Sequence, residues 1–113
     1  MNIQIFGRSK SFDTKKAQRY FSDRGIRVQY IDLAEKPMSR GEFTSVKNAL
    51  GGLDEMIDES CRNKELLSLF RYLTQEAKEE KTLENQILLK VPIVRNGKLA
   101  TVGYAPDIWK NWT

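Results

Sequence analysis

The stretch from Ile87 to Tyr104, "ILLKVPIVRNGKLATVGY", limits the possible folds more than any other part of the chain. Asn96-Gly97 stands between two apolar runs, and this pairing is a strong signal for a β-hairpin. Pro92 lies inside the first run, where a central strand would lose a hydrogen-bond donor. A cis peptide bond in a turn that leads into the strand would remove this conflict. The stretch therefore predicts a hairpin that the chain enters through a proline turn.

The first part of the chain predicts a βαβ unit. Residues 2–6 read as a short strand, because Ile3 and Ile5 alternate with polar neighbours. Ser11 or Asp13 can cap the following helix, and Gly25 ends it. The apolar face of that helix consists of Ala17, Tyr20 and Phe21. A second strand is predicted over 27–33, with Val28, Tyr30 and Asp32 alternating against Gln29 and Ile31. A helix between two strands predicts parallel pairing with a right-handed crossover.

The middle of the chain is predicted to be helical. Ser39 and Glu42 form the capping box "SRGE", and Gly51-Gly52 ends a helix whose apolar stripe is Phe43, Val46 and Leu50. The acidic stretch "LDEMIDES" predicts one helical turn. A longer helix is predicted over 63–77 from the spacing of Leu66, Phe70, Leu73 and Ala77. The stretch "KEEKTLENQ" then predicts a charged surface segment of helix and loop.

A closing helix is predicted over 105–112, with Ile108, Trp109 and Trp112 facing inward. The order of elements is then β-α-β-α-α-β-β-α. A chain of 113 residues predicts a single domain over 1–113, with the helices of about 39–84 as one block. The start "MNIQIFGRSK" reads as a strand rather than a signal peptide, and no apolar run is long enough to cross a membrane. These features predict a soluble, cytoplasmic protein.

The count of reactive residues excludes several kinds of chemistry. The sequence has no histidine, which removes a Ser-His-Asp triad, a Cys-His pair and the commonest metal ligand, so we expect no metal site. Cys61 is the single cysteine, so no intramolecular disulfide can form, which fits a reducing compartment. The formal net charge of +4 permits an anionic partner without requiring one. We find no nucleic-acid motif and expect no direct contact with nucleic acid.

The element order and three sequence segments resemble the arsenate reductase (ArsC) and Spx family. The segments are "IQIFGRSKSFDTKKAQRYF", "VQYIDLAEKPMSRGEF" and "LLKVPIVRNGKLATVGYAPDIWK", and together they span the whole chain. The resemblance implies an α/β fold of the thioredoxin-like, glutaredoxin-like type. It would have a four-stranded mixed sheet and a helical insert at about 39–84 between the second and third strands.

The resemblance also indicates where the family's functional residues would fall. Family members carry a cysteine at the start of the first helix, and the alignment of "KKA" with the family's "RKA" places Ser11 at that position. Thr14 falls at the position of the second cysteine, and Pro92 matches the cis-proline. Two of the family's anion-binding arginines fall on Val91 and Tyr104. Arg62 is the nearest candidate for a third, which lies in the insert. The resemblance thus implies a fold kept without its nucleophile.

A serine at position 11 cannot perform the family's thiol chemistry. A helix N-terminus lowers a cysteine pKa to roughly 3.5–7.5, so a cysteine there is ionised at neutral pH. A serine hydroxyl stays protonated there, and it becomes a nucleophile only beside a base that this chain lacks. Serine also forms no disulfide. Ser11 and Asp13 are therefore interpreted first as helix caps.

Two further interpretations of these residues stay open. Free N–H groups at the start of the helix attract anions, and Arg8, Lys10, Ser11 and Thr14 form a candidate anion site, with Lys15 and Lys16 close by in the sequence. Cys61 is the candidate for redox chemistry, although a lone cysteine is most often a small apolar core residue. The aromatic residues Tyr104, Trp109 and Trp112 are interpreted as packing residues.

Three functions follow as hypotheses. The first is a non-catalytic binding or regulatory module, an arsenate reductase-like pseudoenzyme, for which the resemblance to Spx implies the RNA polymerase alpha subunit as a partner. The second is a weak glutathione- or glutaredoxin-dependent reductase or transferase that uses Cys61 or bound glutathione. The third is an oxyanion-binding protein at the start of the first helix. We expect no cofactor, no membrane partner and a monomer.

Overall fold

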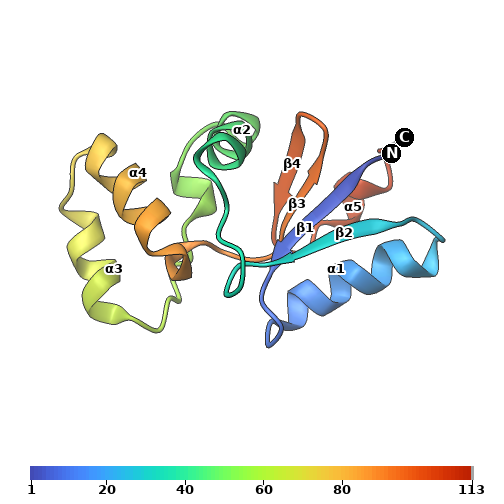
Figure 1. The fold of residues 1–113 in the computed structure, drawn as a ribbon, viewed down its shortest axis with the longest axis horizontal. Coiled ribbons are helices and arrows are strands. Elements are labelled where there is room, and N and C mark those ends of the chain that lie inside the picture. Colours follow the sequence, from blue (N-terminus) through green and yellow to red (C-terminus); the bar gives the residue numbers. More distant parts are fainter. Residues whose placement is uncertain (113) are drawn as a thin grey trace.

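The computed structural model describes residues 1–112 and has four strands, five α-helices and two short 3₁₀ turns within that range. The strands are β1 (Ile3–Gly7), β2 (Val28–Asp32), β3 (Ile93–Asn96) and β4 (Leu99–Val102). The α-helices are α1 (Phe12–Asp23), α2 (Arg40–Leu50), α3 (Lys64–Arg71), α4 (Gln75–Glu84) and α5 (Pro106–Trp109), with 3₁₀ turns η1 (Asp54–Met56) and η2 (Gln86–Leu88). Figure 1 shows the sheet with α1 at one end of an elongated molecule and the α3–α4 pair at the other.

The four strands form one mixed sheet in the order β2-β1-β3-β4. β1 pairs with β2 in parallel, which confirms the predicted βαβ unit, while β1–β3 and β3–β4 are antiparallel. The Val91-Pro92 peptide bond is cis, as the sequence predicts. The hairpin itself differs by one residue from its prediction. Asn96 pairs with Leu99, so the tight turn is Gly97-Lys98, and the positive φ of +61° falls on Gly97.

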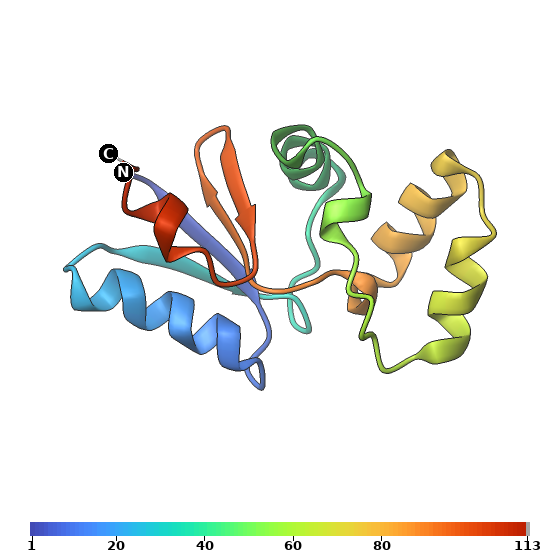
Figure 2. The ribbon, with the colours of Figure 1, turned by 180° about the vertical axis from the view of Figure 1, so that it is seen from behind.

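Helices cover the two faces of the sheet and create two separate cores. α1 and α5 lie on one face of the sheet (Figure 2). There Ala17, Phe21 and Trp109 pack against Ile5 and Val94. On the other face the sheet packs against α2, the 3₁₀ turns and α3. That larger core is formed by Phe6, Ile31, Leu33, Met38, Phe43, Val46, Leu53, Met56, Ile57, Cys61, Leu67, Phe70, Leu88, Leu89 and Ile93. The sheet and the helical segment between β2 and β3 therefore share one apolar core.

The alternation predicted for the second strand is wrong in its inward residues. Ile31 is buried, whereas Val28 and Tyr30 are only half-buried. The reason is that β2 packs on both faces: Ile31 belongs to the larger core, while Val28 and Tyr30 pack against the core under α1. A strand with two covered faces does not show the simple alternation of a half-buried strand.

The predicted helix over 63–77 is two helices in the structure. α3 ends at Arg71, and α4 begins after Thr74, whose hydroxyl accepts a hydrogen bond from the Ala77 N–H. The side chain of Thr74 thus competes with a continuous helix and starts a new one. The buried residues of α3 are Leu67 and Phe70, whereas Leu66 and Leu73 are half-buried. Part of the predicted surface segment lies inside α4, where Thr82 is fully buried.

The closing helix is shorter than predicted, because α5 covers only Pro106–Trp109. Trp109 is buried as predicted and its indole N–H donates to the Thr101 hydroxyl at 2.8 Å. Ile108, in contrast, is 52% exposed, and Trp112 is half-buried. The indole of Trp109 determines which side of this single turn faces the core, and Ile108 then lies on the outer side.

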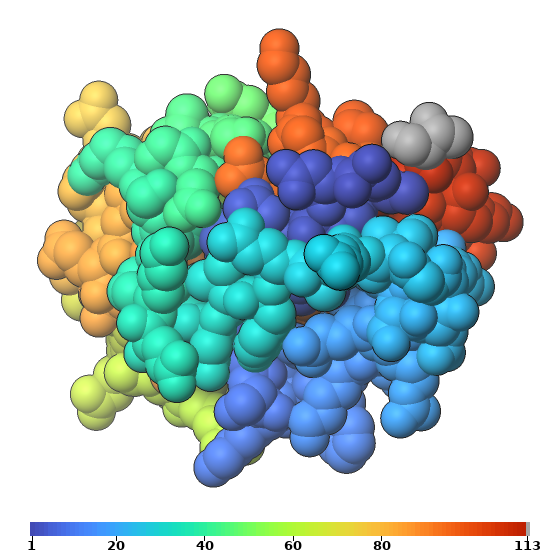
Figure 3. Space-filling model, turned by 45° about the vertical axis from the view of Figure 1, so that its right-hand side comes forward, coloured from blue at the N-terminus to red at the C-terminus, as the bar shows by residue number. Residues whose placement is uncertain are grey.

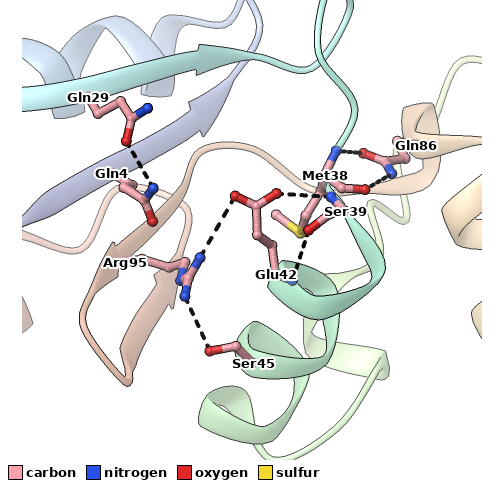
Figure 4. Close-up of polar contacts among 8 residues, drawn as sticks. All are labelled: Gln4, Gln29, Met38, Ser39, Glu42, Ser45, Gln86 and Arg95. Atoms are coloured by element: carbon pink, nitrogen blue, oxygen red, sulfur yellow. Dashed lines mark hydrogen bonds and ion pairs between the residues drawn. The ribbon is translucent and has the colours of Figure 1, made fainter.

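Polar contacts fix α2 against the sheet and against η2 (Figure 4). The predicted capping box is present: the Ser39 hydroxyl accepts from the Glu42 N–H, and the Glu42 carboxylate accepts from the Ser39 N–H. The same carboxylate lies 4.0 Å from the Arg95 guanidinium on β3. The side-chain amide of Gln86 accepts from the Met38 N–H at 2.7 Å and donates to the Met38 C=O at 2.8 Å.

Candidate functional site

A pocket of about 630 Å³ lies where β1 and β2 end, between the sheet and the helical segment. Residues from four parts of the chain line it, within 8–13, 32–34, 58–62 and 87–91. Figure 3 shows the loop after β1, in blue at the lower edge, beside the segment that precedes α3. Because β1 and β2 are parallel, their carboxyl ends meet at one edge of the sheet, and this edge holds the pocket.

Ser11 lines this pocket and caps α1, as predicted. Its hydroxyl oxygen accepts a hydrogen bond from the Thr14 N–H at 3.1 Å. Its φ and ψ of −80° and 121° are those of an N-cap residue. The Ser11 oxygen therefore satisfies one of the free N–H groups at the start of the helix, which would otherwise be available to an anion.

Thr14 is a residue of the core rather than of the pocket wall. It is fully buried, and its hydroxyl oxygen accepts from the Arg8 N–H at 3.5 Å. A Cβ atom added at Gly7 would come within 2.4 Å of the Thr14 methyl carbon. Gly7 and Thr14 thus bring the end of β1 and the first turn of α1 into direct contact. The predicted anion contact of Thr14 does not match this location.

Arg8 lines the pocket, but two of its N–H groups are bound to main-chain oxygens. The guanidinium donates to the Gln86 C=O at 2.6 Å and to the Leu89 C=O at 3.1 Å. Burial lowers the pKa of Arg8, and the nearby Asp58, Cys61 and Asp32 oppose this shift. An arginine side chain in a protein keeps its proton at neutral pH, so Arg8 brings a positive charge to the pocket. The main role visible for Arg8 is to fasten β1 to the η2 turn.

Cys61 lies in the same pocket wall as Ser11. Its side chain is buried, with 1% of its surface exposed, and its Sγ lies 3.6 Å from the Ile87 C=O as a weak hydrogen-bond donor. The cysteine also belongs to the larger apolar core. This environment matches the interpretation of Cys61 as a small core residue, while its place in the wall keeps the thiol close to the candidate site.

The pocket is mixed in charge rather than basic. Arg8, Lys10, Arg62 and Lys90 line it together with three aspartates, Asp13, Asp32 and Asp58. The Asp32 carboxylate accepts from the Ala34 N–H at 2.9 Å, and the Asp58 carboxylate accepts from the Ser60 N–H at 2.8 Å. Sequence reasoning missed Asp32, although its place at the end of a strand parallel to β1 could have indicated it. Asp58 and Lys90 carry no such signal, since their positions depend on the insert.

The remaining predicted site residues occupy different places. Val91 and Arg62 line the pocket, with Val91 half-buried and Arg62 exposed. Tyr104, Lys15 and Lys16 lie outside the wall: Lys16 is 5.2 Å from the centre of the Tyr104 ring, and Lys15 is 6.0 Å from that of Phe12. Among residues 1–112, no group of three or more acidic or cysteine side chains could hold a metal ion. No helix in the same range is long and apolar enough to span a bilayer.

Comparison with known proteins identifies the fold. No family model matches the chain. The uncharacterised protein YusI of Bacillus subtilis is 23% identical over 117 residues, which cover 99% of each chain. A crystal structure from Bacteroides fragilis, described as related to the ArsC family, matches with a TM-score of 0.85 and 17% identity over 100% of this chain and 98% of the other. The chain has the thioredoxin-like fold of the ArsC proteins.

Two further structures support that assignment. An arsenate reductase from Vibrio cholerae matches with a TM-score of 0.81 and 22% identity, over 96% of this chain and 94% of the other. A glutaredoxin-like NrdH-redoxin from Escherichia coli matches with a TM-score of 0.53 and 18% identity, over 100% and 96%. The helical segment between β2 and β3 is therefore part of an ArsC-type fold. The predicted fold class is confirmed.

Proposed function

We propose that this chain is an ArsC-related protein that binds a partner and does not catalyse arsenate reduction. The observation that carries the proposal is that Ser11 serves as a helix cap at the position of the family's nucleophile. This residue stands at the start of α1, at the edge of the pocket, and its oxygen is engaged as a helix cap. By the sequence resemblance, relatives carry the nucleophilic cysteine at this position. A serine there keeps the helix and loses the thiolate.

The groups around Ser11 support this proposal. The sequence contains no histidine, so the carboxylates available as a general base in the pocket are those of Asp13, Asp32 and Asp58. Asp32 and Asp58 each accept a main-chain N–H two residues further on, so one oxygen of each carboxylate is engaged in a local turn. The pocket thus offers charged groups of both signs to a ligand and contains no activated nucleophile.

A protein is the class of ligand that we propose, and the RNA polymerase alpha subunit is the candidate that the resemblance to Spx implies. A regulatory protein of this kind would act in the cytoplasm, which also fits the single reduced cysteine. Binding of the purified alpha subunit to the immobilised chain would test this partner directly. The absence of any binding would exclude the alpha subunit as the partner. It would not affect the proposal that the chain does not reduce arsenate.

One observation favours a second candidate function, a thiol-dependent reductase that uses Cys61. The thiol lies in the same pocket wall as Ser11, so a substrate bound there would be close to sulfur. Against it stand the 1% exposure of Cys61 and its contact with the Ile87 C=O. A thiolate must be reached by its substrate in order to react.

Arsenate reduction in the presence of glutathione and glutaredoxin decides between the two candidates. We expect the wild-type chain and Cys61→Ala to match the reaction without protein. Ser11→Cys, made in the Cys61→Ala background, should gain a thiol that iodoacetamide alkylates at neutral pH, because the helix start lowers its pKa. If the wild type reduces arsenate and Cys61→Ala does not, the non-catalytic proposal is wrong and the second candidate is right.

A further inference from the structure

Two exposed aromatic side chains and two lysines form a surface beside the pocket, outside the two buried cores. We call Phe12, Lys15, Lys16 and Tyr104 the aromatic–lysine surface. Phe12 is 81% exposed and Tyr104 is 43% exposed. Both lysines are exposed as well. The apolar surface of Phe12 in particular contributes little to folding, because most of it faces solvent.

The four side chains form two lysine–aromatic pairs, Lys15 with Phe12 and Lys16 with Tyr104. Phe12 and Lys16 are one helical turn apart on α1, so they lie on the same side of that helix. The Lys16 ammonium lies 5.2 Å from the centre of the Tyr104 ring, and the Lys15 ammonium lies 6.0 Å from that of Phe12. Tyr104 is itself held edge-on against Trp109 at 5.6 Å. Because Phe12 and Lys16 share one side of α1, the two lysine–aromatic pairs lie next to each other on the surface.

The aromatic–lysine surface continues into the pocket. Phe12 directly follows Ser11, which lines the pocket wall. On the other side, the Gly103 N–H donates to the Pro92 C=O at 2.8 Å, so the residue before Tyr104 is tied to the residue after Val91. Lys10 and Lys90 lie in the pocket wall and extend the positive charge past Ser11. An extended ligand could therefore contact the aromatic rings and the pocket together.

The charge of this region points to an acidic ligand of mixed character. The surface offers two ammonium groups next to two rings, which suits carboxylates alternating with apolar side chains. A nucleic acid is disfavoured, because Asp13, Asp32 and Asp58 line the adjoining pocket and would repel a continuous chain of phosphates. A peptide can place a neutral or basic residue opposite these carboxylates.

We propose that the aromatic–lysine surface binds an extended acidic peptide segment of a partner protein, with an apolar side chain between Phe12 and Tyr104. This inference rests on the proposed non-catalytic function and names the chemistry of its partner. The carboxylates of the peptide contact Lys15 and Lys16, while the rings cover its apolar side chain. Binding should weaken as salt is added, since the ammonium groups are exposed.

Three labelled probes test the proposal by fluorescence polarisation with the full chain. The first is a synthetic peptide in which glutamate alternates with leucine and phenylalanine. The second has the same apolar residues with lysine in place of glutamate, and the third is a single-stranded DNA oligonucleotide of similar length. We expect the acidic peptide alone to bind, with amide shifts in a ¹⁵N–¹H spectrum centred on the first turns of α1 and on Tyr104.

Substitutions locate the binding. Phe12→Ser and the pair Lys15→Glu with Lys16→Glu should each weaken binding of the acidic peptide by about tenfold or more. Both alter exposed side chains and should leave the fold intact. Tyr72→Ser is the matched control, because Tyr72 is an 88% exposed aromatic at the end of α3, and this variant should bind as the wild type does.

Several outcomes would overturn the inference. They are no polarisation change at millimolar peptide, equal binding of the basic peptide, tighter binding of the oligonucleotide, or an equal loss in Tyr72→Ser. Each of these removes the surface as an acidic-peptide site without bearing on catalysis. Arsenate reduction by the wild-type chain would instead overturn the proposed function, so the two failures are distinguishable.

Discussion

At the scale of single residues, two buried polar atoms have no hydrogen-bond partner within residues 1–112. They are the Tyr30 hydroxyl oxygen and the Arg95 Nε. A buried polar group without a partner gives up its hydrogen bonds to water and gains nothing in return. Burial raises the pKa of Tyr30, and the nearby Asp32 and Glu35 raise it further. The neutral form of this phenol is therefore favoured in the folded state.

Tyr30→Phe is predicted to equal or exceed the wild type in stability at neutral pH, by up to about 1 kcal/mol, because it removes the unpartnered hydroxyl. The difference in stability between Tyr30→Phe and the wild type should widen at alkaline pH. With a raised folded pKa, the stability that Tyr30 contributes is fully present below its unfolded pKa of about 10 and is lost as the pH rises through the folded pKa. Urea unfolding at neutral pH and at about pH 11 measures both effects.

Tyr72→Phe serves as the control for this comparison, since Tyr72 is 88% exposed. It should track the wild type at both pH values. A parallel loss of stability with pH in Tyr30→Phe and the wild type would show that the ionisation of Tyr30 does not differ between the folded and unfolded states.

The predictability of site residues depends on how local their contacts are. Ser11 could be placed from the sequence, because an N-cap depends on residues three positions apart. The role of Arg8 could not, because its acceptor on Gln86 is 78 positions away and its orientation depends on the insert. The sequence predicts an anion contact for Thr14, whereas its side chain is fully buried in the core. Helical spacing predicts the side of α1 on which Thr14 lies. Only the close approach of Gly7 shows that this side chain is a core residue.

At the scale of elements, the sequence predicted where helices begin better than where they end or divide. Ser39 and Glu42 carry their own signal in the capping box, and α2 begins where they predict. The division between α3 and α4 carries a weaker sequence signal. Leu66, Phe70, Leu73 and Ala77 continue a helical spacing across it, and only the hydroxyl of Thr74 marks the break. Periodicity describes which side of a helix is apolar, whereas a single side-chain hydrogen bond decides whether the helix continues.

Gln86→Ala is predicted to lower the free energy of unfolding by about 1–3 kcal/mol, because it leaves buried main-chain groups unpaired. The Gln86 amide makes two hydrogen bonds to Met38, whose side chain is 3% exposed, and so joins η2 to the start of α2. Hydrogen exchange should speed up at the Met38 amide, and urea unfolding gives the total loss.

Gln75→Ala is the matched control, since Gln75 is an exposed residue at the start of α4. It should change stability by less than about 0.5 kcal/mol. Unchanged exchange at Met38 in Gln86→Ala would mean that the amide clamp does not hold this junction.

At the scale of the whole molecule, the elongated shape is held together by a core that the sheet and the helical segment share. The molecule measures 43 × 26 × 24 Å, and α3 and α4 form its far end (Figure 1). Yet Leu67 and Phe70 of α3 pack in the same core as Phe6 and Ile93 of the sheet. The insert and the sheet therefore depend on each other for burial.

Urea unfolding is predicted to follow one cooperative transition for both parts of the molecule. Far-UV circular dichroism reports on all the helices, including α3 and α4, whereas the fluorescence of buried Trp109 reports on the core under α1. Because the larger core joins the insert to the sheet, the two midpoints should coincide. An earlier transition in the dichroism alone would mean that the insert unfolds separately.

Phe70→Ala extends this prediction. It should cost about 3–5 kcal/mol and move both midpoints together, since Phe70 is 4% exposed in the shared core. Leu69→Ala on the same helix is the control, because Leu69 is 51% exposed. A loss seen only by dichroism in Phe70→Ala would contradict a shared core.

The two hydrogen bonds of Arg8 to the Gln86 and Leu89 carbonyls make ligand binding and the position of the insert linked quantities. An anion that draws the guanidinium away from these carbonyls, rather than using its remaining N–H groups, would loosen η2. By reciprocity, any change that loosens η2 raises the affinity for that anion by the same factor. Competition between such an anion and the two carbonyls for Arg8 would thus couple the contents of the pocket to the η2 turn that leads into β3.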